Sequence, residues 1–134
     1  MPSPEISQLI RTFFDGISQG EVSEELLTPD MTFWSVNSGK TDKPRFLAGI
    51  KVLAQIANRS IQYTIVALTA EEDRVVAEVT STGTLINGEA LSNNHVFLFR
   101  LRDEKIASAA EYMNQIVVRE KIAPLMQEIM SKAE

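Results

Sequence analysis

The chain has 134 residues, of which 44% are hydrophobic and 23% are charged, and its formal net charge is −5. Length and composition fit one globular domain, residues 1–134, and the acidic balance argues against nucleic acid and anionic membrane surfaces, which are bound through clustered Lys and Arg. The absence of cysteine excludes disulfides and thiolate chemistry. No signal peptide or membrane span is visible, so we expect a cytoplasmic protein.

The part of the chain before residue 71 predicts helices and strands in alternation. Ser3 and Pro4 are typical of a helix start, and an apolar repeat at helical spacing continues until Gly20. Thr41-Asp42 caps a later helix. The other elements expected here are a short helix over residues 21–27, a strand over 31–36, a loop over 37–40, the capped helix over 43–57 and a strand over 60–70.

Three antiparallel strands are expected over residues 74–114, joined by turns at Asn87-Gly88 and Asp103-Glu104. If both turns are two-residue loops, Thr80 faces His95, and His95 faces Tyr112. A bulge in either hairpin would move part of the set to the other face. The face that carries His95 then mixes aromatic and polar side chains: Val76, Glu78, Thr80, Thr82, Asn93, His95, Phe97, Phe99, Ala110, Tyr112 and Asn114.

The last stretch predicts an extra C-terminal helix, with a kink or restart at Pro124 because proline removes a backbone N–H and clashes with the preceding turn. Its apolar stripe could cover a pocket or bury against a second subunit. The order of elements is α+β, with helices on one face of a curved sheet that leaves a concave apolar pocket. The stripe consists of Val118, Ile122, Leu125, Met126 and Ile129.

Two segments carry a resemblance to a known family. They are LIRTFFDGISQGEVSEELLTPDMTFW, residues 9–34, and GTLINGEALSNNHVFLFRLRDEKIASAAEYMN, residues 83–114. The chain resembles the SnoaL-like and ketosteroid isomerase-like members of the nuclear transport factor 2-like superfamily. The resemblance implies a cone-shaped antiparallel or mixed sheet wrapped around N-terminal helices, a cystatin-like α+β barrel, with cofactor-free chemistry of the isomerase, cyclase or hydrolase type.

The chain departs from this family pattern at the end of the second segment. Asn114 stands where the catalytic members have an aspartate that acts as acid or base, and an amide can only orient a substrate or donate a hydrogen bond. We therefore give Asn114 a positioning role. Arg100 and Arg102 fall on the face opposite the pocket in the expected register.

The residues themselves suggest a catalytic set of His95, Glu78 and Tyr112. Histidine is the side chain whose ordinary chemistry suits a general base at neutral pH, so His95 would take that role, Glu78 would fix its tautomer, and Tyr112 would donate to an enolate or alkoxide oxygen. Trp34 is either core packing or a pocket wall. The other expected substrate contacts are Phe14, Phe97, Phe99, Asn93 and Asn114. Proton abstraction next to a carbonyl in a small hydrophobic molecule is the reaction this set would serve.

Other functions stay open at this point. His95 and Tyr112 could instead be a structural polar pair, and the pocket could hold an apolar ligand without chemistry. The chain could also act as a dimeric interaction domain, and a homodimer is the expected assembly. No cluster with metal-ligand spacing and no phosphate-binding loop is visible, so no cofactor or metal is expected.

Overall fold

The N-terminal helix packs against the inner face of the sheet. The computed structural model describes residues 2–132, and α1 spans Pro4–Gln19. Ser3 accepts a hydrogen bond from the N–H of Ile6, and Gly20 ends the helix with a φ of 80°, a left-handed conformation that glycine adopts without strain. Both predicted ends are confirmed. The apolar stripe that the helix buries comprises Ile10, Phe13, Phe14 and Ile17.

A strand, a tight turn and a second helix follow. A short 3₁₀ turn, Glu24–Leu26, replaces most of the expected second helix, because strand β1 (Leu27–Ser35) already begins at its end. Strand β2 (Gly39–Asp42) folds back on β1, and α2 (Lys43–Ile56) follows directly. The Asp42 side chain caps α2 by accepting from the N–H of Arg45, as predicted.

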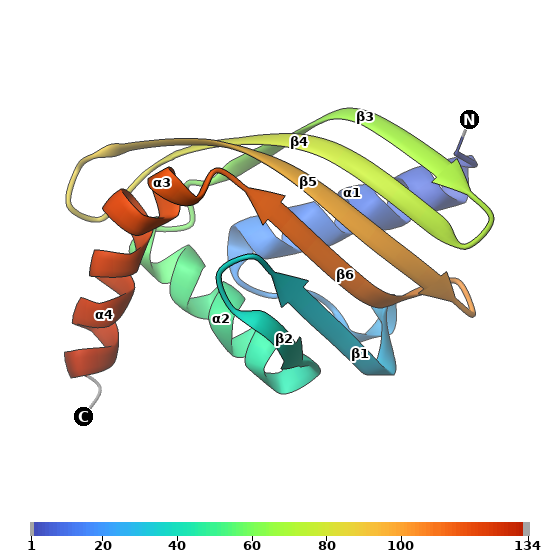
Figure 1. Ribbon diagram of the computed structural model, residues 1–134, viewed down its shortest axis with the longest axis horizontal. Helices are drawn as coiled ribbons and strands as arrows, with labels where there is room; N and C mark the ends of the chain where they lie inside the picture. Colours follow the sequence, from blue (N-terminus) through green and yellow to red (C-terminus); the bar gives the residue numbers. More distant parts are fainter. Residues whose placement is uncertain (1, 133–134) are drawn as a thin grey trace.

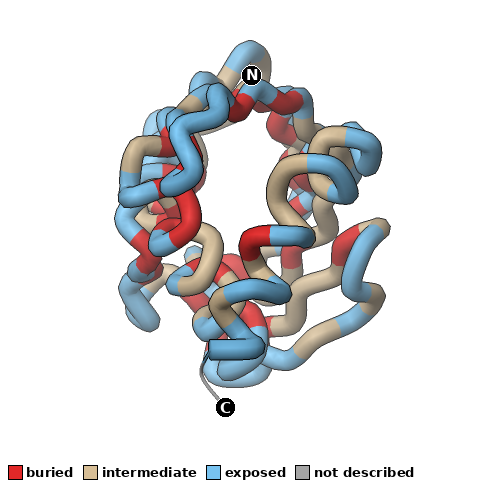
Figure 2. The backbone as a smooth tube through the Cα atoms, turned by 90° about the vertical axis from the view of Figure 1, so that its left-hand side faces the viewer, coloured by how far each residue is buried: buried red, intermediate tan, exposed pale blue. Residues whose placement is uncertain are grey.

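Six strands form one curved mixed sheet around α1 (Figure 1). The remaining strands are β3 (Gln62–Glu71), β4 (Arg74–Thr84), β5 (Ala90–Arg102) and β6 (Lys105–Met113). The order is β2-β1-β6-β5-β4-β3, and only β1 and β6 run parallel. Seen after a quarter turn, the sheet and the helices close around the interior (Figure 2). The predicted α+β class, with helices against a curved sheet, is confirmed.

Aromatic rings from α1, α2 and the sheet fill the centre of this fold. Phe13 meets Phe99 edge to face with ring centroids 5.3 Å apart, and Phe14 meets Phe97 at 4.9 Å. Edge-to-face pairs place the positive ring edge on the negative ring face, which adds about 0.5–1.5 kcal/mol beyond burial. This packing fixes how the inner face of β5 lies against α1.

The β4–β5 hairpin is one residue out of the expected register. His95 pairs with Val79, whereas the expected partner was Thr80. The N–H of Leu85 donates to the carbonyl of Glu89, so the loop has three residues, and it ends on Gly88 with a φ of 87°. Such loops are a common alternative to the two-residue turn. The slip reverses the faces of β4: it buries Val75, Ala77, Val79 and Ser81 and turns Val76, Glu78, Thr80 and Thr82 outward.

The β5–β6 hairpin begins in the expected register and then leaves it. Arg102 pairs with Lys105, but a bulge at Ala107 shifts every later pair by one residue, so His95 faces Met113. Because side chains alternate along a strand, one extra residue exchanges the two faces beyond it. The bulge turns Ala109 and Glu111 inward and Ala110 and Tyr112 outward.

The C-terminal helix restarts around Pro124, as predicted. After α3 (Gln115–Val117), residues Val118–Ile122 form a π-helical turn, and α4 spans Ala123–Lys132. The wider turn frees the position where the proline ring would otherwise clash. Leu125 anchors the helix in a second core cluster that also contains Ile56, Ala57, Ile61, Leu85 and Leu91. Within residues 2–132, every helix is too short or too polar to span a membrane.

Candidate functional site

A cavity of about 270 Å³ lies between the inner face of the sheet, α2 and the C-terminal helix. This volume is slightly below the range of about 300–1,000 Å³ that is usual for small-molecule sites. Its walls are mainly apolar, with the polar groups gathered on the strands and on the β1–β2 turn. The apolar walls are Ile17, Phe33, Phe46, Ile50, Leu53, Phe97, Met113, Val118, Ile122 and Met126, and the polar ones are Ser35, Asn37, Ser38, Thr41, Arg45, Tyr63, Asn93, His95 and Glu111.

Three inward-facing polar residues form a hydrogen-bonded chain across β4, β5 and β6. Nε2 of His95 lies 2.8 Å from Oγ of Ser81, and Nδ1 of His95 lies 2.7 Å from Oε2 of Glu111. The His95 side chain is 8% exposed and that of Glu111 is 17% exposed. Both imidazole nitrogens are therefore engaged, and the imidazole has no free lone pair for a ligand.

The second carboxylate oxygen of Glu111 differs from the first, which is bound to His95. Oε1 makes no hydrogen bond to a described residue, yet every fully buried side-chain oxygen or nitrogen among residues 2–132 has a partner. Oε1 is thus accessible, and Glu111 lines the cavity. A carboxylate held by one oxygen and open at the other, against apolar walls, has the geometry of a general base.

Tyr63 on β3 adds a hydrogen-bond donor beside this pair. Its ring centroid lies 5.9 Å from that of His95, and it lines the cavity. Burial, and then the negative charge of Glu111, raise the pKa of Tyr63 above its ordinary value. The phenol therefore stays neutral and can donate a hydrogen bond at any physiological pH.

The structure places five of the nine predicted site residues at or directly behind the cavity. Asn93, His95 and Phe97 line it, on the predicted inner face of β5. Phe14 and Phe99 are buried in the aromatic core behind Phe97. The side chain of Asn93 is committed to the fold, because it donates to the Asn114 carbonyl and accepts from the N–H of Asn94.

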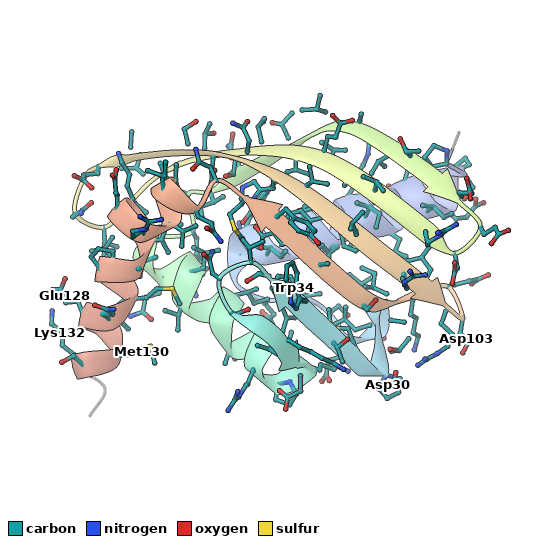
Figure 3. The ribbon with its side chains drawn as sticks, in the orientation of Figure 1. Asp30, Trp34, Asp103, Glu128, Met130 and Lys132 are labelled. Carbon is teal, nitrogen blue, oxygen red and sulfur yellow. The ribbon has the colours of Figure 1, made fainter. Side chains whose placement is uncertain are left out.

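Four predicted site residues lie elsewhere. Glu78 and Tyr112 are on the outer face of the sheet because of the two register slips. Trp34 on β1 (Figure 3) packs against Tyr112 there, with ring centroids 5.1 Å apart, so its expected place in the pocket wall is wrong. Asn114 is exposed and caps α3 by accepting a hydrogen bond from the N–H of Ile116. Its amide thus has a structural role that needs no ligand.

Sequence reasoning missed three polar residues that line the cavity, Glu111, Tyr63 and Arg45, and one that lies behind it, Ser81. Glu111 belongs to the Glu-Tyr pair near the end of segment 83–114, one of the two segments that carry the family resemblance, and that resemblance was a usable signal. Ser81 and Tyr63 carried no local signal, because their role depends on strand pairing. Arg45 is an exposed residue in the first turn of α2 that lines the cavity. It adds a positive charge, whereas the strand residues that line the cavity include no lysine or arginine.

The C-terminal helix closes the cavity. Val118 and Ile122 from the π-helical turn and Met126 from α4 line it. Of the two roles left open for this helix, covering the pocket is the one the structure shows. The wider turn sets which side of the helix faces the cavity, because it adds a residue to one turn.

Elsewhere in residues 2–132, the hollow next to α1 is less suited to chemistry than this cavity. A hollow of about 810 Å³ lies between α1, the 3₁₀ turn and α2, and its lining contains neither histidine nor tyrosine. Within residues 2–132, no three His, Asp or Glu side chains gather closely enough to hold a metal ion. We therefore place the candidate site in the cavity under the sheet.

Comparison with known proteins agrees with this fold. A sequence profile of the SnoaL-like domain matches residues 10–109, whereas no curated protein matches the chain. An NTF2-like protein from Anabaena variabilis ATCC 29413 is 25% identical, with a TM-score of 0.73 over 85% of this chain and 94% of that one. A proposed SnoaL-like polyketide cyclase from Jannaschia sp. CCS1 is 19% identical, with a TM-score of 0.77 over 92% of this chain and 96% of that one.

A third solved structure has the same fold with another activity in its name. AclR, a proposed hydroxylase from Streptomyces galilaeus, is 19% identical, with a TM-score of 0.74 over 96% of this chain and 91% of that one. The three structures share one scaffold, and the names of two of them give different activities. The profile match covers most of the chain, and the chain therefore belongs to the SnoaL-like domain family of the NTF2-like superfamily.

Proposed function

We propose that this protein catalyses cofactor-free proton transfer next to the carbonyl of a small hydrophobic molecule, with Glu111 as the general base. The observation that carries the proposal is the carboxylate of Glu111, held by His95 through one oxygen and open to an apolar cavity through the other. At the packing density of protein interiors, a cavity of about 270 Å³ holds a molecule of roughly ten to twelve non-hydrogen atoms.

The proposed step uses three groups of the cavity. Oε1 of Glu111 takes a proton from the carbon beside the carbonyl, and the electron pair of that C–H bond moves into an enolate. The neutral hydroxyl of Tyr63 donates to the enolate oxygen, where negative charge develops. Glu111 then returns the proton to carbon, so the enzyme is regenerated without a cofactor. His95 holds the carboxylate instead of acting as the base, because both of its nitrogens are occupied.

Two relatives make this reaction class reasonable. The Jannaschia protein is named as a proposed polyketide cyclase, and a Bacillus subtilis protein of the same fold, 20% identical, is named as a proposed isomerase. Cyclisation through a carbanion and isomerisation both begin with removal of a proton beside a carbonyl. The same cavity can instead serve only to bind an apolar ligand, and the experiment must separate the two functions.

Hydrogen exchange provides a direct test. 2-Tetralone, an eleven-heavy-atom ketone, is incubated in D₂O with the protein, and deuterium uptake at its α-carbons is followed by NMR, with binding measured by calorimetry. We expect the wild type to accelerate uptake and Glu111→Gln to lose about 10²–10⁴-fold of that acceleration.

The matched control is Glu78→Gln, which removes a carboxylate from the outer face of β4, two strands away from Glu111, and should leave the rate unchanged. If 2-tetralone binds but exchanges no faster with the protein than in buffer, the pocket is a binding site for this ketone and the catalytic proposal fails for it. Equal rates for wild type and Glu111→Gln would remove Glu111 from the base role.

We also propose that a second copy of this chain covers the outer face of the sheet. Val96, Leu98 and Tyr112 are 39%, 40% and 46% exposed on adjoining strands there. Glu78 lies beside Val96 at one side of this apolar patch, and Arg100 lies beyond Leu98 at the other. A two-fold axis through the patch would bring each glutamate near the arginine of the other copy.

Sedimentation of charge variants tests the assembly. We expect a dimer for the wild type, a monomer for Glu78→Arg, and recovery of the dimer when Arg100→Glu is added to that variant. A wild type that stays monomeric at all concentrations would remove this proposal without affecting the pocket.

A further inference from the structure

The buried end of the Ser81–His95–Glu111 chain has no role in the reaction as described above. Ser81 is 3% exposed on the inner face of β4 and does not line the cavity. Its Oγ lies 2.8 Å from Nε2 of His95, on the side of the imidazole away from Glu111. A ligand therefore cannot touch Ser81, and any influence on the reaction must pass through His95.

The surroundings of Ser81 decide which way its proton points. Among the described residues, His95 is the sole side-chain partner of the Ser81 hydroxyl. If Nε2–H donated to Oγ, the hydroxyl proton of Ser81 would be buried without an acceptor, which costs about 1–3 kcal/mol. If the hydroxyl donates to Nε2 instead, no donor is left unpaired. The second arrangement is therefore favoured.

The position of the proton on Nδ1, the other imidazole nitrogen, follows from this arrangement. With Nε2 accepting from Ser81, the neutral imidazole carries its proton on Nδ1. Nδ1 lies 2.7 Å from Oε2 of Glu111, and an ionised carboxylate can only accept. The N–H thus points at the carboxylate. The reverse tautomer would place a bare nitrogen lone pair against a negatively charged oxygen and would disfavour the ionised base.

We propose that Ser81 is a positioning residue that fixes the Nδ1–H tautomer of His95 and so keeps a hydrogen-bond donor on Glu111. The proposal rests on the proposed function only where it calls Glu111 the base. It links three neighbouring strands, because Ser81, His95 and Glu111 lie on β4, β5 and β6, and strand register alone brings them together.

The composition of the chain makes the tautomer directly observable. His95 is the only histidine in 134 residues, so once any purification tag is removed, a long-range ¹H–¹⁵N correlation spectrum shows one imidazole. In neutral to mildly alkaline buffer we expect the wild type to show one tautomer with the proton on Nδ1. Ser81→Ala should admit the Nε2–H tautomer, and Ser81→Thr, which keeps a hydroxyl, should restore the first.

Deuterium uptake by 2-tetralone supplies the second measurement. Loss of one hydrogen bond of about 1.4 kcal/mol corresponds to roughly a tenfold lower rate for Ser81→Ala, with recovery in Ser81→Thr. The matched control is Ser92→Ala, an exposed serine on the outer face of β5, which should change neither spectrum nor rate.

The two proposals can fail separately. A wild-type imidazole protonated on Nε2, or on both nitrogens, overturns the role of Ser81 even if Glu111→Gln abolishes exchange. An unchanged tautomer in Ser81→Ala overturns it as well. A wild-type Nδ1–H tautomer that is lost in Ser81→Ala and recovered in Ser81→Thr supports it even if the wild type exchanges no 2-tetralone, a result that would count against the proposed function alone.

Discussion

The inner and outer faces of the sheet carry the same kinds of side chain and differ in what surrounds them. Glu111 and Tyr63 line the cavity on the inner face, whereas Glu78 and Tyr112 are exposed on the outer face. In a single copy of the chain, the outer pair is exposed to water. On the inner face the imidazole of His95 replaces water at one carboxylate oxygen, and burial keeps the phenol protonated. The difference in chemistry comes from burial and partners rather than from residue type.

This comparison also explains why the register counted through two-residue turns put Glu78 and Tyr112 beside His95 on the inner face, where the structure does not have them. Each predicted catalytic partner of His95 is exposed on the outer face, while a residue of the same type stands on the inner face within a few ångströms of the imidazole. In a sheet, a displacement of one residue is a change of face. The largest expected effect is therefore a difference in unfolding free energy between variants at neighbouring positions of β5, one on each face.

Phe97→Ala and Val96→Ala should differ strongly in stability. Phe97 is 2% exposed and packs against Phe14, so its truncation leaves a cavity and should cost about 3–5 kcal/mol of unfolding free energy. Val96, 39% exposed, should cost under about 1 kcal/mol. Urea unfolding at a concentration where the chain is monomeric measures both. Similar losses at the two positions would contradict the observed faces.

Met126→Ala and Met130→Ala extend the same contrast to the C-terminal helix. Met126 lines the cavity, whereas Met130 is 61% exposed on α4 (Figure 3). Loss of the Met126 side chain should weaken 2-tetralone binding roughly tenfold, about 1.4 kcal/mol, because the ligand loses apolar contacts. Met130→Ala should bind like the wild type in calorimetry. If neither variant changes affinity, the helix does not contact this ligand.

The two tyrosines give the smallest effect, which appears only in alkali. Tyr112→Phe leaves Tyr63 as one remaining tyrosine of the two in the chain. Because burial raises the pKa of Tyr63, its phenolate absorbance should still be absent where an ordinary tyrosine, with a pKa of about 10, is half ionised. A normal titration of Tyr63 would show that its hydroxyl is hydrated as well as that of an ordinary tyrosine.

The same shift predicts the direction of a stability change. Above pH about 10 the unfolded chain releases the Tyr63 proton while the folded chain keeps it, so the unfolded state binds fewer protons and the unfolding free energy falls as pH rises. Below pH about 10 the contribution is constant. Tyr63→Phe should flatten this alkaline dependence, which urea unfolding at several pH values would show.

Local signals in the sequence predicted the two long helices α1 and α2 and strand β5, but not the short turn at residues 24–26, where a helix was expected. Ser3, Gly20 and Asp42 act where they stand in the chain, because a cap needs only the backbone of the next turn. The inner face of β5 followed from alternation alone. Short-range chemistry of this kind can be predicted from a single sequence.

The partners of β5 could not be predicted in the same way. The choice between a two- and a three-residue loop at Gly88 depends on how both strands twist, and the bulge at Ala107 lies in a run of small residues that carries no turn signal. The site depends on these two details. Glu111 and Ser81 reach His95 only through strand pairing, and Tyr63 reaches it from a fourth strand.

The bulge in β6 also bears on how related chains should be aligned. A relative that lacks the residue at Ala107 would keep every later pair with β5, and its glutamate would still reach the pocket. A relative that lacks a residue between Ala109 and Glu111 would present the equivalent of Tyr112 there, a phenol in place of the carboxylate. Gaps a few positions apart in an alignment would thus separate chains that retain the acidic group from chains that have exchanged it.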